Sequence, residues 1–176
     1  MGAIGGLSDL APRVRCVILI DPPAWPAHGR LWSHLVSDSA LDELHAFARS
    51  AGVSRRAFDV DHYDVPGEMY DDLVGLGALP LPARELLARL SSSGLRVRQA
   101  DKVAVGAHLR AEYLTGHWAE LGPALVCGPP EEWARRWAGI GAELLRRWSE
   151  PHRRYHDVLH LDHVLASLDL LDGLGE

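Results

Sequence analysis

The feature that most constrains the fold is a short, unbroken apolar run, VRCVILID, at residues 14–21. The run is rich in β-branched side chains and ends at an acidic residue, Asp21. A short run that is apolar at every position is typical of a strand buried on both faces, because a half-exposed strand would alternate with polar residues. The run therefore predicts a strand inside a sheet whose two faces are both covered.

Helical and extended patterns alternate after this run. Apolar spacing and turn residues predict helices at 39–52, 68–78 and 83–94, and further strands at 56–66 and 95–98. The alternation predicts an α/β fold, with a small, mostly parallel sheet and flanking helices over residues 14–100. Residues 22–38, which include three prolines, are predicted to form a long loop beyond the strand ends, where such sheets bind ligands.

The second half of the chain has a different character. Residues 101–129 show weak periodicity and are predicted to form a connector with some helix. Residues 130–176 are predicted to hold two helices, one from Pro130 to about Trp148 and one from about His152 to Leu171. A chain of 176 residues fits this arrangement of one small domain followed by a helical segment.

Composition limits the classes of partner. The net charge of −6, with Lys102 as the sole lysine, argues against an extended nucleic-acid-binding surface. No stretch approaches the ~20 apolar residues of a membrane span, and the N-terminus lacks the pattern of a signal peptide. We therefore expect a cytoplasmic protein without a membrane partner. Arginine supplies nearly all of the positive charge and suits phosphate contacts, so a small phosphorylated or nucleotide-like ligand is expected.

Histidines and aspartates gather near the predicted strand ends. His34 and Asp38 are four residues apart, which is close on a helical turn, and His62 and Asp64 share one face if their segment is extended. Imidazole and carboxylate groups are ligands for divalent metals. We expect His34, Asp38 and His62 to bind such a metal, of unidentified type, with Asp64 orienting them and His45 as a weaker ligand. The alternative is structural: Asp38 as a helix cap, His45 on a helix flank and His62 bonded to a turn.

The same cluster is the predicted catalytic site. His34, His62 and Asp64 are expected to act as general acid and base groups or through the metal. Trp25 or Trp32 could stack on a base, although burial is the more usual fate of tryptophan. No serine-nucleophile, P-loop or dinucleotide-binding motif occurs in the sequence. The predicted substrate-binding residues are Asp21, His28, Arg30, Trp32, Tyr63 and Arg84.

Several motifs of the first half carry a family resemblance. They are HGRLWSHLVSD at 28–38, DELHAFA at 42–48, DHYDVP at 61–66 and GALPLPARELLARL at 77–90. With them, the stretch from Val17 to about Arg98 resembles a bacterial and phage family known only as a domain of unknown function (numbered forty thirty-one). The resemblance brings no established reaction, so the chemistry must be argued from the residues.

The stretch RRWSEPHRRYHDVLHLDHVLASL at 146–168 resembles the opening of an HD-superfamily metal-dependent phosphohydrolase domain. The resemblance implies that His160 is a metal ligand and that His156 contacts phosphate or acts as a general acid, supported by Tyr155. The given sequence ends at residue 176 without the later His-Asp pair and final aspartate of that family. A metal held by one histidine is not a catalytic metal. We therefore expect this segment to be a remnant or a first half of such a domain, inactive alone.

Two functions from different classes follow from the sequence. The first is a metal-dependent hydrolase of the phosphohydrolase class, acting on a phosphoester or nucleotide-like substrate at the strand ends of the first domain. The second is a non-enzymatic ligand-binding or accessory module, in which the C-terminal helices form a packing surface or a homodimer interface. A further expectation is that the chain is a shortened version of a two-domain protein.

Overall fold

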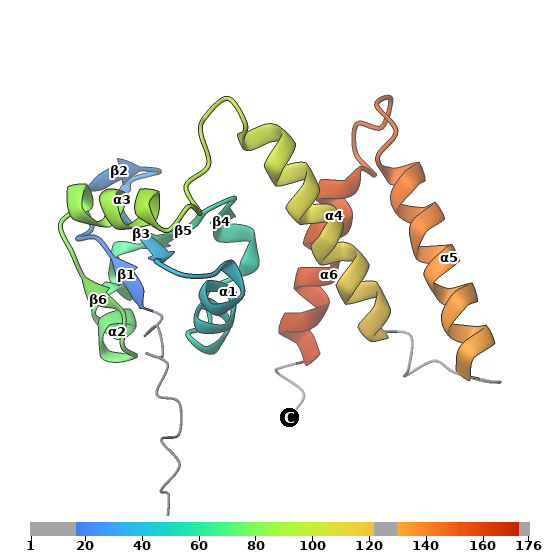
Figure 1. The fold of residues 1–176 in the computed structure, drawn as a ribbon, viewed down its shortest axis with the longest axis horizontal. Helices are drawn as coiled ribbons and strands as arrows, with labels where there is room; N and C mark the ends of the chain where they lie inside the picture. Colours follow the sequence, from blue (N-terminus) through green and yellow to red (C-terminus); the bar gives the residue numbers. More distant parts are fainter. Residues whose placement is uncertain (1–16, 122–129, 173–176) are drawn as a thin grey trace, which may run out of the picture.

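A mixed sheet of six strands organises the N-terminal half of the computed structural model, which describes residues 17–121 and 130–172 (Figure 1). The strand order is β4-β5-β3-β1-β6, and β2 pairs with β3 outside this path. The strands are β1 (Ile18–Ile20), β2 (Trp25–Ala27), β3 (Arg30–Ser37), β4 (Phe58–Asp59), β5 (His62–Pro66) and β6 (Leu79–Pro80).

The sheet is mostly antiparallel, so the prediction of a mostly parallel sheet was wrong. Among the described strands, only β1 and β6 pair in parallel. Residues 22–38 are not a loop, because they contain β2 and the long strand β3. His28 and Gly29 join these strands in a two-residue turn with φ values of 51° and 76°, as a tight hairpin requires. Pro26 is tolerated because β2 pairs with β3 alone and needs no donor on its outer edge.

Helices cover both faces of the sheet. The helices α1 (Leu41–Ser50) and α2 (Tyr70–Gly75) pack on one face, over a core that includes Ile18, Ile20 and Leu35. The helix α3 (Ala83–Ser92) packs on the other face, over Leu19 and Val36. Neighbouring residues of β1 thus enter opposite cores, which confirms the prediction of a strand buried on both faces over residues 18–20, whereas positions 14–16 of the predicted strand lie outside the described residues.

The connections between these elements are short. The 3-10 helices η1 (Arg55–Ala57) and η2 (Gly67–Met69) precede β4 and α2. Residues 95–98, predicted as a strand, form no strand. The backbone N–H of Val97 donates instead to the carboxylate of Asp61, 2.7 Å away. This segment therefore crosses the β4–β5 hairpin without extending the sheet.

Three longer helices form the C-terminal half: α4 (Lys102–Leu121), α5 (Pro130–Trp148) and α6 (Val158–Asp172). The helix α4 occupies most of the predicted connector and packs against both α5 and α6, beside the sheet domain (Figure 1). The remaining connector residues, 122–129, lie outside the described residues. Trp118 of α4 stacks on Trp137 of α5 at 4.2 Å, and each indole N–H donates to the other residue's backbone carbonyl. No helix of the described ranges is long and apolar enough to cross a membrane.

The last helix begins later than predicted. It starts at Val158 instead of near His152, because Asp157 caps its N-terminus by accepting a hydrogen bond from the backbone N–H of His160 at 2.9 Å. His152 and His156 therefore lie in the turns before α6 and do not continue its histidine-bearing face.

Candidate metal centre

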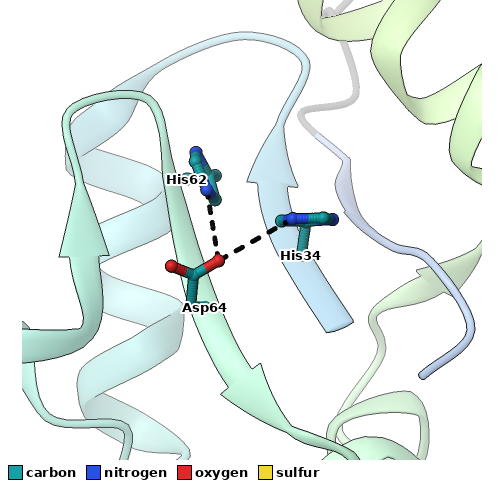
Figure 2. A group of neighbouring side chains, drawn as sticks. All are labelled: His34, His62 and Asp64. Carbon is teal, nitrogen blue, oxygen red and sulfur yellow. Dashed lines mark ion pairs between the residues drawn. The ribbon is translucent and has the colours of Figure 1, made fainter. Parts of the chain in front are cut away.

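The pairing of β3 with β5 brings three polar side chains together on one face of the sheet. His34 lies directly opposite Asp64 in the register of this antiparallel pair. Because successive side chains of a strand alternate, His62 and Asp64 share the face of His34, whereas Tyr63 and Val65 enter the core on the other face. One ligand atom from each of His34, His62 and Asp64 lies within 4.8 Å of the others (Figure 2).

The distances within this cluster, which we call the His-His-Asp cluster, suit a divalent metal. Asp64 Oδ1 lies 3.2 Å from His62 Nε2 and 3.8 Å from His34 Nε2 (Figure 2). Ligand atoms around a tetrahedral zinc ion, at bond lengths of about 2.0–2.1 Å, are roughly 3.3 Å apart. The first contact already has this spacing, and a shift of about 0.5 Å would bring the second to it.

A buried carboxylate lies behind each of the two imidazole rings. His34 Nδ1 donates to Asp21 Oδ2 at 2.9 Å, and His62 Nδ1 donates to Asp61 Oδ1 at 2.7 Å. The Asp21 and Asp61 side chains are 1% and 0% exposed. Metal-binding histidines usually have such a partner, which fixes the ring and leaves the other nitrogen free for the metal. In both histidines the nitrogen on the far side of the ring from this partner is Nε2, and both Nε2 atoms face Asp64.

Asp21 is positioned by the chain that follows β1. Its backbone N–H donates to the carbonyl of His34, and its Oδ1 accepts the backbone N–H of the same residue. Burial acts to raise the pKa of Asp21, but hydrogen bonds from His34 and from the indole of Trp25 outweigh it and lower the pKa below its ordinary value. Asp21 is therefore an ionised carboxylate that holds the His34 ring from behind.

Asp61 is positioned by a strained turn. In a regular strand, Asp61 and His62 would point to opposite faces of the sheet. Asp61 instead lies in the connection between β4 and β5, where the preceding residue, Val60, has a φ of 54°. The Asp61 N–H donates to the Asp59 carbonyl at 2.7 Å, the two-residue bond of a γ-turn. Such backbone strain costs on the order of 1–3 kcal/mol and gathers at functional sites. Arg96 and the N–H of Val97 also bond to the Asp61 carboxylate and offset that cost.

The cluster has an unusual charge state. Burial acts to lower the pKa of His62, but hydrogen bonds to Asp61 and Asp64 outweigh it and raise this pKa to about 9. The same hydrogen bond from His62 lowers the pKa of Asp64. Without a metal, a protonated His62 thus balances the nearby carboxylates. A divalent cation would take over that role and displace the proton.

The cluster is open to solvent on the side of Asp64. The side chain of Asp64 is 46% exposed, against 27% for His34 and 10% for His62. The charge of Lys102, at the start of α4, also helps to lower the pKa of Asp64. A bound metal would therefore have room for water or a substrate on its exposed side, with a cation nearby.

Asp38, predicted as a metal ligand, lies elsewhere. Residues 34–38 form a strand and its end, not a helical turn, so a separation of four residues spans about 13 Å instead of one turn. The Asp38 carboxylate accepts the N–H of Val17 and pairs with Arg89 at 3.2 Å. Asp64, predicted to orient the ligands, takes the third position of the cluster in its place.

His45 and Tyr63 belong to the opposite face of the sheet. His45 Nδ1 shares a hydrogen bond of 2.9 Å with the Tyr63 hydroxyl, and its ring packs against Phe58 at 4.5 Å. Burial lowers the pKa of His45 to about 4, and the charge of Arg55 acts in the same direction. Tyr63 is buried in the core and His45 is half-buried beside it, so the structure brings neither of these two predicted site residues to the His-His-Asp cluster.

The remaining predicted binding residues lie mainly on the β2–β3 hairpin. His28 is exposed at its tip, and the Arg30 guanidinium lies 5.9 Å from the centre of the Trp32 ring. Trp32 and Arg30 precede His34 by two and four residues, so they share its face. Arg84 is exposed in the first turn of α3, and within the described ranges no hydrogen bond or ion pair joins it to the cluster.

His156 and His160 form a second pair of rings, 5.2 Å apart, and both contact Trp148. Both are exposed, and neither ring is hydrogen-bonded to a carboxylate in the part of the chain that the structure describes. The metal role that the HD resemblance implies for them stays a prediction.

Sequence reasoning missed Asp61 and recognised Trp25 only in part. The sequence does place Asp61 directly before His62, in DHYD, but the direction of the Asp61 side chain depends on the turn at Val60. Trp25 was considered only as one of two stacking candidates, because β2 was not predicted. Its indole Nε1 donates to Asp21 Oδ2 at 3.2 Å, and its ring lies 5.2 Å from that of His34.

Comparison with known proteins reaches only the first half of the chain. Residues 18–93 match the model of a family described as a protein of unknown function, DUF4031. Neither a search of curated proteins nor one of solved structures gave a match. The matched range contains the whole sheet, the helices α1–α3, the His-His-Asp cluster and both buried carboxylates. The resemblance seen in the sequence is thus supported over residues 18–93, where the chain is similar to a family of unknown function.

Proposed function

We propose that the protein is a metal-dependent hydrolase of the phosphohydrolase class, with His34, His62 and Asp64 as its metal ligands. One observation carries this proposal. Two imidazole rings, each held at Nδ1 by a buried carboxylate, direct their Nε2 atoms toward one exposed carboxylate. An incidental group of surface charges would lack those buried partners, whereas metal sites use them to orient their ligands.

The ligand set also suits hydrolysis. Three protein ligands leave a coordination position for water, as in catalytic zinc sites. A divalent ion there would lower the pKa of that water toward 7 and polarise a phosphoryl oxygen of the substrate. Asp21 and Asp61 would keep the two rings in place, and Lys102, which pairs with Asp59 near the cluster, would add positive charge for the phosphate.

The proposal can be tested with chelator-treated protein reloaded with Zn²⁺, Mn²⁺, Co²⁺ or Fe²⁺ under anaerobic conditions. We expect metal-dependent hydrolysis of bis(4-nitrophenyl) phosphate, and a fall in kcat of more than about 100-fold in Asp64→Asn and His62→Ala, because each change removes a ligand. A matched control is His108→Ala, since His108 is 72% exposed on α4 and pairs with Glu112. This variant should keep full activity.

The other outcomes distinguish the competing functions. Stoichiometric metal without turnover of any phosphoester would favour the ligand-binding module over the hydrolase. Two histidines and one carboxylate also occur in non-haem Fe(II) oxygenases. Iron-dependent consumption of O₂, without hydrolysis, would therefore replace the proposed reaction with an oxygenation. Failure to bind any of the four ions would contradict the metal centre itself.

A further inference from the structure

A half-exposed tryptophan stands beside the His-His-Asp cluster. Trp25, on β2, is 50% exposed, and its ring centre lies 5.2 Å from that of His34, with the two planes inclined at 64°. Tryptophan contributes to stability mainly by burial, so a large indole left half in solvent adds less to the core than it could. Its place beside a metal ligand suggests a role in recognition.

The indole is also held in a fixed position. Trp25 Nε1 donates to Asp21 Oδ2, the same oxygen that accepts the hydrogen bond from His34 Nδ1. One buried carboxylate thus sets both the metal ligand and the neighbouring aromatic ring. Because the ring is already ordered, a ligand that stacks on it would lose little affinity to the ordering of the protein.

The hairpin continues this surface away from the cluster. Trp25 lies directly opposite Trp32 in the β2–β3 register, and Trp32 shares the face of His34. The Trp32 indole N–H donates to the Ala27 carbonyl at 2.9 Å, and the Arg30 guanidinium lies over the Trp32 ring. Among the described acidic residues, none forms an ion pair with Arg30. Two indoles and a guanidinium thus follow one another along the hairpin from His34.

We infer that Trp25 is the base-stacking residue of a nucleotide site, whose ligand places its phosphate at the His-His-Asp cluster and its base on the exposed indole. The inference rests on the proposed function and adds to it the substrate class, a nucleoside phosphate. Base-stacking on an aromatic side chain changes affinity by roughly 5- to 150-fold. The site should therefore bind nucleoside monophosphates more tightly than aliphatic phosphate esters of the same charge.

The test compares three ligands on zinc-loaded protein by titration calorimetry: adenosine 5′-monophosphate, uridine 5′-monophosphate and glycerol 2-phosphate. The wild type should prefer the two nucleotides by at least about 5-fold. Trp25→Ala should remove this preference and leave glycerol 2-phosphate affinity and zinc stoichiometry close to those of the wild type. Trp25→Phe, which keeps an aromatic face, should retain part of it.

Leu31→Ala is the matched control. Leu31 is 48% exposed on the same hairpin but points to the face opposite Trp32, so its loss should not change the preference. Equal affinity of the wild type for all three ligands, or an unchanged preference in Trp25→Ala, would overturn the inference while leaving the metal centre intact.

Failure of the metal centre would be seen separately. If the wild type binds no zinc, the proposed function fails, and the stacking site is then tested with uncharged adenosine on the metal-free protein by NMR titration. Binding that is lost in Trp25→Ala would support the stacking residue, and the absence of binding would overturn it.

Discussion

The protein contains two pairs of neighbouring histidines that differ in what lies behind the rings. The His34 and His62 ring centres are 5.1 Å apart, and those of His156 and His160 are 5.2 Å apart. Proximity and residue type are therefore the same in both places. Among the residues that the structure describes, only the sheet pair has a buried carboxylate on each Nδ1 and a third carboxylate facing each Nε2. A buried carboxylate on Nδ1 therefore identifies a candidate metal-binding histidine better than the number of histidines in a stretch of sequence does.

The cause of this difference is the amount of buried structure around each pair. In the sheet domain, Asp21 and Asp61 are fully buried and hydrogen-bonded: Trp25 and His34 donate to Asp21, and Arg96 and the Val97 N–H donate to Asp61. In the described parts of α4, α5 and α6, the buried hydrophobic side chains are only Leu114 and Leu165. The nearest acid of the second pair, Asp157, caps α6 through the backbone N–H of His160. It therefore orients the helix, whereas Asp21 and Asp61 orient rings.

Removing Asp61 from the sheet domain should destabilise the protein far more than removing Asp157 from the helical half. Asp61→Ala should lower the free energy of unfolding by about 3–5 kcal/mol, because it leaves Arg96, the Val97 N–H and a buried imidazolium without their partner. Asp157→Ala should cost about 1 kcal/mol, the usual loss of a helix cap. Urea unfolding of metal-free protein, followed by circular dichroism, measures both. Equal losses would show that Asp61 has no special supporting role.

The pH dependence of stability should also come from the sheet domain. The pKa of His62 rises from 6.5 to about 9 on folding, so its contribution is complete below pH 6.5 and is lost as the pH rises through 9. The pKa of His45 falls from 6.5 to about 4, so its contribution is present above pH 6.5 and is lost as the pH falls through 4. The two together predict maximal stability of the metal-free protein near pH 6.5, with losses of roughly 3 kcal/mol on each side.

Variants assign each side of this profile to one histidine. Compared with the wild type, His62→Gln should flatten the alkaline side of the profile, and His45→Gln should flatten the acidic side. Thermal unfolding between pH 4 and pH 9 measures the three profiles. An alkaline loss that persists in His62→Gln would contradict the buried imidazolium.

A smaller effect tests the carboxylate behind His34. Asp21→Asn keeps the size of the side chain but removes its charge, and should weaken metal binding by about 10- to 100-fold. Asp162→Asn is the control in the helical half, where Asp162 pairs with Arg110 at 3.2 Å. Competition with a zinc-sensitive dye measures both affinities, and equal affinities in the two variants would remove Asp21 from the metal centre.

The smallest effect concerns two serines of β3. The buried Ser33 hydroxyl has no hydrogen-bond partner among the residues that the structure describes, so Ser33→Ala should leave stability unchanged or raise it by up to about 1 kcal/mol. Ser37 Oγ donates to Glu43 at 3.0 Å, so Ser37→Ala should lower stability by about 1 kcal/mol. Urea unfolding of the two variants would show opposite or unequal shifts, and equal losses would show that Ser33 has a partner.

Local patterns predicted the parts of the fold that depend on local physics. The buried strand β1 and the helices α1–α3 were expected because apolar spacing and turn residues lie within each segment. The antiparallel direction of the strands was not expected. Three prolines in residues 22–27 argued against a strand there, so neither the edge strand β2 nor the chain reversal at His28 and Gly29 was predicted. The helix α4 was predicted only in part, since Gly106 and Gly116 weaken its periodicity.

Residues of the candidate site were also predicted only in part. Residue type pointed to His34, and residue type with period-two spacing pointed to His62 and Asp64, although Asp64 was given the supporting role and Asp38 the ligand role. That exchange follows from one error, a helical turn where β3 is extended. The orientation of Asp61 depends on the left-handed backbone of Val60. No local sequence pattern predicts that conformation, because β-branched residues rarely adopt it.

Equilibrium dialysis against Zn²⁺ tests the central claim most directly, with His62→Ala and His160→Ala compared with the wild type at neutral pH. We expect about one ion per wild-type chain. We also expect unchanged binding in His160→Ala, and a loss of affinity of more than about 100-fold in His62→Ala. Zinc that is retained in His62→Ala but lost in His160→Ala would place the metal at His156 and His160 and would contradict a metal centre at the His-His-Asp cluster.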